Sequence, residues 1–308
     1  VGPRRRAPTQ PGKSGAMSAY ASIFRAGLFE GQVGIVTGGG SGIGRCISHE
    51  LGALGATVVI ASRDPEKLER TRAELVGDGV RADAIACDIR KEDQVQALVR
   101  ETLARHGRLD FVVNNGGGQF VSPIENLSVR GWQAVIDTNL TGAFLMSREA
   151  CTQYMRDHGG AIVNIVAEMW RGMPMMGHSG AARAGVVNLT QTCALEWAQH
   201  RIRVNALAPG LILSSGFKSY PEPVQEAMKS LPSQIPARRF GTESEVSAGV
   251  VYLLSPAAAY ITGETLRIDG ALPLYRQPFE LPDHRPNRAF RGFHRATDAP
   301  PGLEAGDE

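Results

Sequence analysis

The feature that most constrains this chain is a regular alternation of short apolar runs with segments of helical periodicity, which begins at Gln32. Strands buried on both faces read as continuous apolar runs, and helices alternate with strands where the sheet is parallel. We therefore expect an α/β fold: a single doubly wound parallel sheet of about seven strands, with helices on both faces and a small inserted lid. The apolar runs are VGIVTGGG (33–40), TVVIASR (57–63), ADAIACDI (82–89), LDFVVNNGGG (109–118), AIVNIVA (161–167), RIRVNALAPG (201–210) and ETLRIDG (264–270).

The chain of 308 residues is expected to hold one domain between two extensions. Residues 28–275 carry the alternation, without an internal repeat or an interdomain linker. Within them, four prolines interrupt residues 213–240, which predicts a loop-and-helix lid over the substrate. Residues 1–27 are expected to be a flexible extension. Residues 276–308 contain Pro and Asp without periodicity and predict a loosely ordered tail.

The charge of the chain argues against a nucleic-acid partner. The formal net charge is +2, but residues 1–16 hold four basic residues and no acidic one, so the remainder carries 29 basic and 31 acidic residues. Nucleic-acid binding needs a cationic surface, which this balance does not provide. We interpret residues 1–16 as an over-extended start upstream of Met17, and a transit sequence is the alternative.

The cysteines and the hydropathy pattern point to the cytoplasm. Cys46, Cys87, Cys151 and Cys193 are tens of residues apart and form no Cys-x-x-Cys pair. We therefore expect no metal site and no disulfide framework. No apolar run of about 18 residues is present, so no membrane span is expected. The last residues lack a peroxisomal address of the Ser-Lys-Leu type, which favours a cytoplasmic protein.

A glycine-rich turn between the first strand and the first helix predicts a dinucleotide site. One glycine permits the tight turn, one lets the backbone approach the pyrophosphate, and one lets helix and strand pack closely. The helix N-terminus then offers unpaired N–H groups to the anion. A plain glycine turn is the alternative, but the strand before it and the helix after it favour the cofactor. The candidate residues are Thr37, Gly38, Ser41, Gly42, Ile43 and Gly44.

The end of the second strand favours NADP(H) over NAD(H). A carboxylate at this position would hold a ribose 2′-hydroxyl, whereas a cation accommodates a 2′-phosphate. The strand ends in Ser62 and Arg63, which can donate to the phosphate and pair with it. The alternative is that Arg63 is an ordinary surface residue of a solvated loop.

Five motifs in order resemble the short-chain dehydrogenase/reductase family over roughly residues 28–275. They are TGGGSGIG (37–44), Asp88 after the third strand, NNGGG (114–118), Asn139 in DTNLTG, and Pro209-Gly210 after the sixth strand. Within this family, NNGGGQF, HSGAARAG, ALEWA and LLSPAAAYITGE are most similar to peroxisomal trans-2-enoyl-CoA reductases and their bacterial relatives, with dienoyl-CoA reductases next.

The resemblance implies a Rossmann-type fold, an NADP(H)-dependent oxidoreductase and a set of cofactor contacts. It also implies a homotetramer assembled through helices over about 129–157 and 180–199. The implied contacts follow three strand ends and are Asp88 and Ile89 at the adenine, Asn115, Gly116 and Gly117 at the ribose and nicotinamide, and Pro209, Gly210 and Ile212 at the carboxamide.

The catalytic groups that the family uses for carbonyl reduction are largely missing. The family's Tyr is Ser179 here, its Lys is Arg183, and the slot of its Ser falls at Val166-Ala167. A Ser hydroxyl is a far poorer acid than a phenol and Arg does not release its proton, so ketone reduction would lose a factor of order 10²–10⁴. Dienoyl-CoA reductases of the family also carry Ser in the Tyr slot.

Reduction of a C=C bond conjugated to a thioester requires stabilisation of a negative charge on oxygen rather than an acid that protonates it. Negative charge collects on the thioester oxygen, which a hydroxyl and a fixed cation can stabilise without transferring a proton to it. We therefore assign Ser179 and Arg183 as catalytic candidates, with Arg183 also on the cofactor ribose and Asn139 as a water relay. Ser179 as a simple cap of a helix beginning near Gly180 is the alternative, and Asn139 as a structural pin is another.

The proton donor to Cα stays open at this point. Trans-2-enoyl-CoA reductases carry a Tyr at the position of Val187, so this chain lacks that group as well. His178, Glu168, Tyr220 and water remain as donors. The neighbouring Arg238 and Arg239 are either partners for the phosphates of coenzyme A or a solvated pair. The rival functions are a 3-oxoacyl or other alcohol/carbonyl oxidoreductase and a non-catalytic NADP(H)-binding module.

Overall fold

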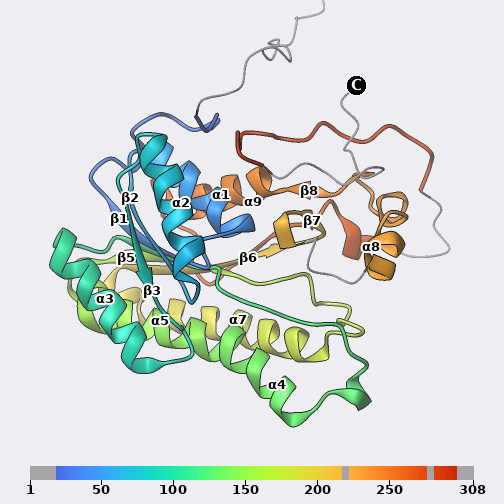
Figure 1. Cartoon of the computed structure of the whole chain (residues 1–308), viewed down its shortest axis with the longest axis horizontal. Helices are drawn as coiled ribbons and strands as arrows, with labels where there is room; N and C mark the ends of the chain where they lie inside the picture. Colours follow the sequence, from blue (N-terminus) through green and yellow to red (C-terminus); the bar gives the residue numbers. More distant parts are fainter. Residues whose placement is uncertain (1–18, 217–221, 276–280, 297–308) are drawn as a thin grey trace, which may run out of the picture.

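The computed structural model describes residues 19–216, 222–275 and 281–296 (Figure 1). Its centre is a seven-stranded sheet in the order β3-β2-β1-β4-β5-β6-β9, in which every pair of neighbours is parallel. This confirms the predicted doubly wound sheet. The strands are β1 (Val33–Thr37), β2 (Thr57–Ser62), β3 (Ala82–Ala86), β4 (Phe111–Asn114), β5 (Gly160–Ile165), β6 (Ile202–Pro209) and β9 (Thr265–Ile268).

Helices cover both faces of the sheet, as Figure 1 shows. One face carries α1 (Gly42–Ala53), α2 (Pro65–Gly77) and α9 (Glu243–Leu254). The other carries α3 (Glu92–His106), α4 (Val129–Ile136), α5 (Gly142–Ala150) and α7 (Gly177–Glu196). Two π-helical turns, Asp137–Thr141 and Cys151–Met155, join α4, α5 and the short α6 (Arg156–His158) into one run. The remaining short elements are α8 (Glu222–Met228) and 3₁₀ turns at Ile124–Asn126, Ala198–His200, Leu231–Gln234, Pro256–Ala258 and Leu272–Leu274.

The continuous apolar strands supply two cores, one on each side of the sheet. In β1, all five residues are buried. Side chains alternate along a strand, so Val36 and Ile60 join the cluster under α1 and α9, whereas Ile35 and Val59 join the cluster over α3 and α5. Burial on both faces therefore explains why these strands lack a polar alternation.

The topology places a crevice at the carboxyl ends of β1 and β4. β1 pairs with β2 on one side and with β4 on the other, so the order of the strands in the sheet reverses at β1. In open α/β sheets, ligands bind at such a switch point because the two connecting loops separate there. The glycine-rich turn after β1 and the NNGGG segment after β4 lie at this edge.

The segment expected as a lid forms a small unit beside the sheet. Its base is a two-stranded parallel sheet of β7 (Ile212–Leu213) and β8 (Gly241–Thr242). Met228 and Leu231 pack against the buried Ile235 and Phe240, so the unit has an apolar core of its own. Tyr220, one of the candidate proton donors, lies outside the described residues.

The C-terminal segment departs from the expected loose tail over residues 281–296. Residues 281–288 contact residues 236–239, and residues 293–295 contact α1, α9 and the C-cap of α2. Phe293 is buried against Tyr20 and Cys46. Arg238 donates to the carbonyl oxygens of Leu281 and Pro282. The segment lacks helical or strand periodicity because side-chain contacts hold it, rather than regular backbone pairing.

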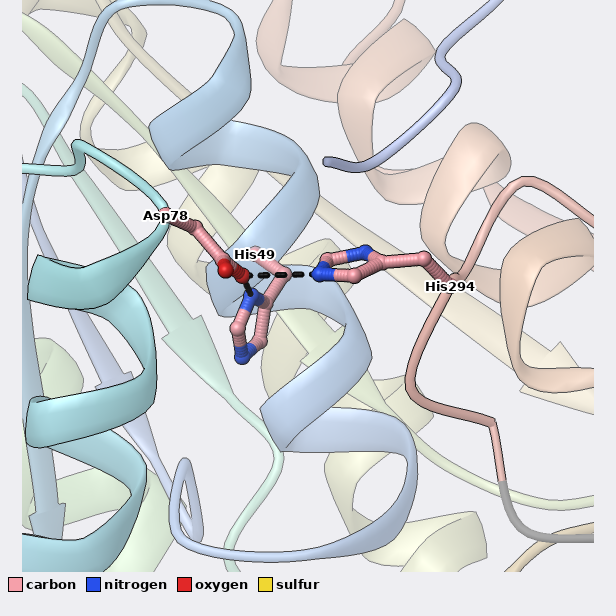
Figure 2. A group of neighbouring side chains, drawn as sticks. All are labelled: His49, Asp78 and His294. Atoms are coloured by element: carbon pink, nitrogen blue, oxygen red, sulfur yellow. Dashed lines mark hydrogen bonds and ion pairs between the residues drawn. The ribbon is translucent and has the colours of Figure 1, made fainter. Parts of the chain in front are cut away.

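A buried polar cluster anchors the end of this segment (Figure 2). Asp78, at the C-cap of α2, accepts from His49 of α1 at 3.0 Å and from His294 at 2.8 Å. Arg295 contacts both oxygens of the same carboxylate, at 2.6 and 3.1 Å. The three ligand-type atoms of His49, Asp78 and His294 lie within 4.8 Å of one another, an arrangement that cysteine spacing alone did not suggest. We interpret the cluster as a hydrogen-bonded network, because the Arg295 guanidinium already neutralises Asp78.

None of the helices in the described ranges is long and apolar enough to cross a membrane.

Candidate cofactor and active site

The glycine-rich turn has the close packing that a dinucleotide site requires. Gly38 has a φ of +67°, a conformation that L side chains rarely adopt. A Cβ at Gly44 would collide with the Gly38 carbonyl oxygen and the Asn115 amide. Helix and strand can approach this closely because both positions are glycine.

The first turn of α1 leaves its N–H groups available. The side chain of its N-cap, Ser41, makes no capping hydrogen bond, and no acidic residue stands in the first turn. Such a helix end attracts an anion through its N–H groups and its dipole. Beside Gly42 lie Ser214 and Ser215, so the residues present fit a pyrophosphate.

The loop after β4 is tied to this turn. The Thr37 hydroxyl accepts from the backbone N–H groups of Asn115 at 3.1 Å and Gly116 at 2.9 Å. The Asn115 side chain donates to the Thr37 carbonyl oxygen at 3.0 Å. Asn115 therefore uses its amide to hold the two loops together, and its contact with the cofactor ribose stays a prediction.

The end of β2 presents a cation and no free carboxylate. Arg63 is exposed directly after the strand, and Ser62 precedes it. The carboxylate of Asp64 caps α2 by accepting from the Lys67 backbone N–H at 3.1 Å, so it is committed to the helix. The Asp88 carboxylate also lies near enough to Arg63 to feel its charge, but it is paired with Arg90.

The remaining predicted contacts lie at the ends of β3 and β6. Asp88 pairs with Arg90 at 2.6 Å, and this hydrogen-bonded cation holds the pKa of its carboxyl below the usual range. The buried Ile89 packs against Gly116. Pro209 ends β6. After it, Gly210 passes the backbone of Asp269 too closely for a Cβ, and Ile212 begins β7.

Arg183 carries a cation to the segment that follows β4. Its Nη1 donates to the Ile165 carbonyl oxygen at 2.6 Å, and its Nη2 lies against Gly117. The residue as a whole is half-buried, but Nε is fully enclosed and has no hydrogen-bond partner among the described residues. This burial lowers the pKa of the guanidinium to about 10, so it remains charged at neutral pH. No carboxylate of the described part of the chain is paired with it.

Ser179 is fully buried in the first turn of α7, one turn before Arg183 on the same face. Its hydroxyl donates to Gln119 Oε1 at 2.8 Å. The alternative of a helix cap is wrong, because α7 begins at Gly177 with Met176 as its N-cap. Gln119 was missed as a site residue, although it belongs to the NNGGGQF motif that follows β4.

Asn139 also faces the segment after β4. It lies in the π-helical turn between α4 and α5, a local geometry often found at functional sites. Its Oδ1 accepts from the Gly118 N–H at 2.9 Å and its Nδ2 donates to the Gly118 carbonyl oxygen at 3.0 Å. Both ends of the amide are therefore used to fix the backbone, which supports the structural alternative.

Arg183, Asn139 and Ser179 thus converge on three successive residues. They contact Gly117, Gly118 and Gln119 respectively. This convergence brings together all three catalytic candidates at the carboxyl end of β4.

Buried amides that the sequence analysis did not single out support this edge of the sheet. Asn114 Nδ2 donates to Asn164 Oδ1 at 2.8 Å and to Ser147 Oγ at 2.9 Å, and Asn164 Nδ2 donates to Thr190 Oγ1 at 2.8 Å. The network joins β4, β5, α5 and α7. The sequence signal for this network was an Asn in each of the apolar runs FVVN and AIVNI, because a buried amide needs hydrogen-bond partners.

His178 is not placed to donate a proton through Nδ1. It is fully buried, and its Nδ1 accepts from the Ser179 backbone N–H at 2.8 Å. This nitrogen is therefore used by the first turn of α7. Its second face is covered by Phe120, whose ring lies edge-to-face at 4.5 Å.

Glu168 lies on the loop that leaves β5, three residues after Ile165. Its backbone N–H donates to the Pro209 carbonyl oxygen at 3.1 Å. Its Oε1 is buried without a hydrogen-bond partner among the described residues. The loop therefore carries a carboxyl group between the ends of β5 and β6.

Arg238 and Arg239 are committed to the fold, which overturns the suggestion that they meet coenzyme A phosphates. Arg238 donates to backbone carbonyl oxygens of Ser233 and of the C-terminal segment. Arg239 is buried and pairs with Glu245 through both oxygens of that carboxylate.

Comparisons with known proteins agree with this geometry. The profile of the family described as Enoyl-(Acyl carrier protein) reductase matches residues 38–272. A peroxisomal 2,4-dienoyl-CoA reductase, (3E)-enoyl-CoA-producing, of Danio rerio is 37% identical over 257 residues, which cover 82% of this chain and 85% of that protein.

Solved structures share the fold. A citronellol catabolism dehydrogenase of Pseudomonas aeruginosa PAO1 is 51% identical with a TM-score of 0.74, covering 82% of this chain and 99% of that one. A variant of actinorhodin polyketide ketoreductase, determined with NADPH, is 32% identical with a TM-score of 0.76, covering 82% of this chain and all of that one.

Proposed function

Because this chain belongs to the short-chain dehydrogenase/reductase family and is an oxidoreductase, we propose that it uses NADPH to reduce the C=C bond of a 2-enoyl thioester of the acyl-CoA type. The observation that carries the proposal is the convergence of Ser179 and Arg183 on the segment after β4, in a site without the family's usual acid. A fixed cation and a hydroxyl suit a reaction that builds negative charge on a carbonyl oxygen.

NADP(H) is the proposed form of the cofactor. The exposed Arg63 at the end of β2 can pair with a 2′-phosphate, and Asp64, the next residue in the sequence, is used as a helix cap. A structural relative was determined with NADPH. The turn at Gly38 and the open first turn of α1 would hold the pyrophosphate.

A nicotinamide held beside the segment after β4 would supply the hydride that Cβ of the substrate receives. The electron pair of the C=C bond then moves toward the thioester oxygen, which becomes an enolate oxygen. Arg183 stabilises this oxygen by charge, and Ser179 turns its hydroxyl from Gln119 to donate to it. Protonation of Cα completes the reduction without any proton transfer to or from Arg183.

Glu168 is the proposed source of that proton, directly or through a water. Its Oε1 is buried without a hydrogen-bond partner among the described residues, on the loop that follows the Arg183 contact at Ile165, whereas His178 Nδ1 is used by the Ser179 backbone N–H. Glu168→Gln should lower kcat by a factor of order 10²–10⁴ and leave the Kd of NADPH unchanged. Equal kcat values in the two proteins would exclude Glu168 as the donor.

A coenzyme A thioester is favoured as substrate because the 37%-identical relative is named for such a substrate. An alcohol or carbonyl substrate is the second candidate, and the 51%-identical citronellol catabolism dehydrogenase favours it. The two candidates differ in where the hydride goes: to a carbon of a C=C bond, or to a carbonyl carbon.

A substrate panel separates them. Purified protein is mixed with NADPH and, in turn, crotonyl-CoA, a longer trans-2-enoyl-CoA, a 2,4-dienoyl-CoA, acetoacetyl-CoA and citronellal, and absorbance at 340 nm is followed. We expect oxidation of NADPH with the unsaturated thioesters. Turnover of acetoacetyl-CoA or citronellal alone would defeat the proposal in favour of carbonyl chemistry. Silence throughout, with NADPH still bound, would indicate a binding module.

We also propose a homotetramer in the cytoplasm. The four cysteines are free and buried, which fits a reducing compartment. The helices α5 and α7 would form its interface.

A further inference from the structure

A buried carboxyl group stands behind the dinucleotide turn, and no site residue predicted from the sequence accounts for it. Glu243 is the first residue of α9, and its side chain is only 4% exposed. Its Oε1 has no hydrogen-bond partner among the described residues. A Cβ added at Gly42 would lie 3.8 Å from this oxygen and 3.4 Å from Ser215 Oγ. Glu243 therefore faces the glycine where the backbone is expected to approach the pyrophosphate.

The groups that face Glu243 do not neutralise it fully. On α1, Arg45 lies near enough to act on its charge, and Cys46 presents a thiol. Beside β7, the Ser215 backbone N–H donates to the carboxyl group. Arg45 is itself engaged, because it donates to Glu74 at 2.7 Å and to a backbone carbonyl oxygen of the C-terminal segment.

The other charged residue of α9 is paired with an arginine that precedes β8. Glu245 follows two residues later, and both of its oxygens accept from Arg239. The α9 dipole favours an anion at its N-terminus. Burial nevertheless dominates and raises the pKa of Glu243 to about 7. Near neutral pH, the group is therefore divided between its neutral and ionised forms.

A bound dinucleotide would change this balance. Its pyrophosphate brings two negative charges to the turn, and a like charge nearby in a buried site disfavours the ionised carboxylate. A neutral carboxylic acid has an O–H group that can donate to a phosphate oxygen, forming a short hydrogen bond to an anion. Glu243 therefore repels the pyrophosphate when it is ionised and can donate a hydrogen bond to it when it is neutral.

We propose that Glu243 contacts the cofactor pyrophosphate as a neutral carboxylic acid, so that, where the free protein holds Glu243 ionised, each cofactor bound takes up one proton at this residue. The proposal rests on the dinucleotide-binding function proposed above. The proton comes from solvent and leaves with the cofactor, and no other bond is made or broken. Glu243 is in this view a binding residue that makes cofactor affinity depend on pH.

The dependence has a defined sign and window. Below about pH 7 the free protein already holds the proton, and affinity is at its plateau. Above it, the proton must be taken up on binding, so the Kd of NADPH rises about tenfold per pH unit until the pKa of the complex is reached. The 2′-phosphate of NADPH titrates near pH 6, below this window. The nearby Cys46 thiol, whose pKa burial raises well above 9, does not titrate in it.

The test is a titration of the full-length protein with NADPH between pH 6.5 and 9, followed by cofactor fluorescence. In the wild type, the Kd should rise by roughly 10- to 100-fold across this range. Glu243→Gln keeps the size and a hydrogen-bond donor but cannot titrate, so its Kd should stay flat. Glu66→Gln removes an exposed carboxylate from the first turn of α2 and should behave as the wild type.

Calorimetry of the unmutated protein provides a measurement that does not depend on the folding of a variant. NADPH is titrated at pH 8 in buffers of different ionisation enthalpy, and close to one proton should be taken up per cofactor. Tight binding without proton uptake, or a flat Kd in the wild type, would overturn the role of Glu243 and leave the cofactor assignment standing. Absence of NADPH binding at every pH would overturn both.

Discussion

Arg183 places a positive charge in the crevice without a carboxylate to offset it among the described residues. Its Nη1 is held by a backbone carbonyl oxygen, and its Nε is enclosed and unpartnered. Enclosing a cation in this way costs free energy unless an anion completes the site. The arrangement is therefore more readily explained by a transient negative charge in the reaction than by a contribution to the stability of the fold.

Removal of this charge should affect the reaction more than the binding of cofactor. Arg183→Ala is expected to lower kcat with a 2-enoyl thioester by about 10²- to 10³-fold, since it removes an oxyanion-stabilising group. Arg183→Lys should recover part of the rate, because a Lys retains the charge without the planar guanidinium. Steady-state kinetics give kcat, and NADPH titration checks that the site remains folded. An Ala variant at the wild-type rate would exclude Arg183 from the chemistry.

Arg63 sets the preference between the two nicotinamide dinucleotides in our proposal. Charge-assisted hydrogen bonds contribute about 1.5–3 kcal/mol, so Arg63→Asp should weaken NADPH binding by roughly 10- to 100-fold and favour NADH instead. Arg70→Asp makes the same charge change at an exposed site on α2 and serves as the control. The ratio of the two Kd values measures the effect. If both variants keep the wild-type ratio, the 2′-phosphate is held elsewhere.

At the scale of elements, the sequence predicted the features that depend on residues close together in the chain. The apolar runs of β1 and β6 reveal strands buried on both faces, and the glycine spacing at Gly38 and Gly44 predicts the turn between strand and helix. The docking of residues 281–296 was not predictable in this way. His294 reaches Asp78 over 216 residues of sequence, and the tail lacks the periodicity that burial imposes on helices and strands.

The same limit applies to the site. Ser179 and Arg183 were predictable because their slots belong to a motif, and their shared face follows from a spacing of four on a helix. Glu243 and Gln119 become visible only when the fold brings them to the crevice. From the sequence, Glu243 is interpreted as an acidic residue that stabilises the N-terminus of a helix through the helix dipole. Only the structure shows that its side chain is buried.

The docked C-terminal segment makes the stability of the protein sensitive to acid through His49. This side chain is 1% exposed, and burial lowers its pKa from 6.5 to about 4 although Asp78 beside it acts in the opposite direction. The unfolded chain takes up a proton near pH 6.5, whereas the folded protein does so only near pH 4. The free energy of unfolding should therefore fall by about 2 kcal/mol between pH 7.5 and 5 on account of this group.

Urea denaturation at the two pH values measures this change. His49→Gln removes the titrating group, so the part of the pH dependence that it contributes should disappear, whatever the overall stability of the variant. His158→Gln, at an exposed position on α6, is the control and should retain the wild-type slope. An unchanged pH dependence in His49→Gln would show that the cluster does not titrate as the structure indicates.

At the scale of the whole molecule, α5 and α7 leave an apolar surface that one chain does not cover. Phe144 is 41% exposed and Leu195 is 82% exposed. A cavity of about 520 Å³ opens between the two helices and is lined by Phe144, Arg148, Cys151, Thr152, Arg156, Leu189, Thr192, Cys193, Glu196, Trp197 and His200. Exposed apolar patches of this kind mark contact sites between proteins.

A second copy of the chain is the proposed occupant, because the resemblance to the family implied assembly through these same helices. The wild type should then run as a tetramer in light scattering coupled to size exclusion. Leu195→Glu places a charge in the interface, where an unpaired buried charge is costly, and should reduce the assembly to dimers or monomers. Val76→Glu introduces the same charge on α2, at a side chain that is 49% exposed, and should leave the tetramer intact. Because Ser179 and Arg183 also lie on α7, a dissociated Leu195→Glu protein should bind NADPH and yet turn over substrate more slowly. A monomeric wild type, or a tetrameric Leu195→Glu variant, would place the interface on another face.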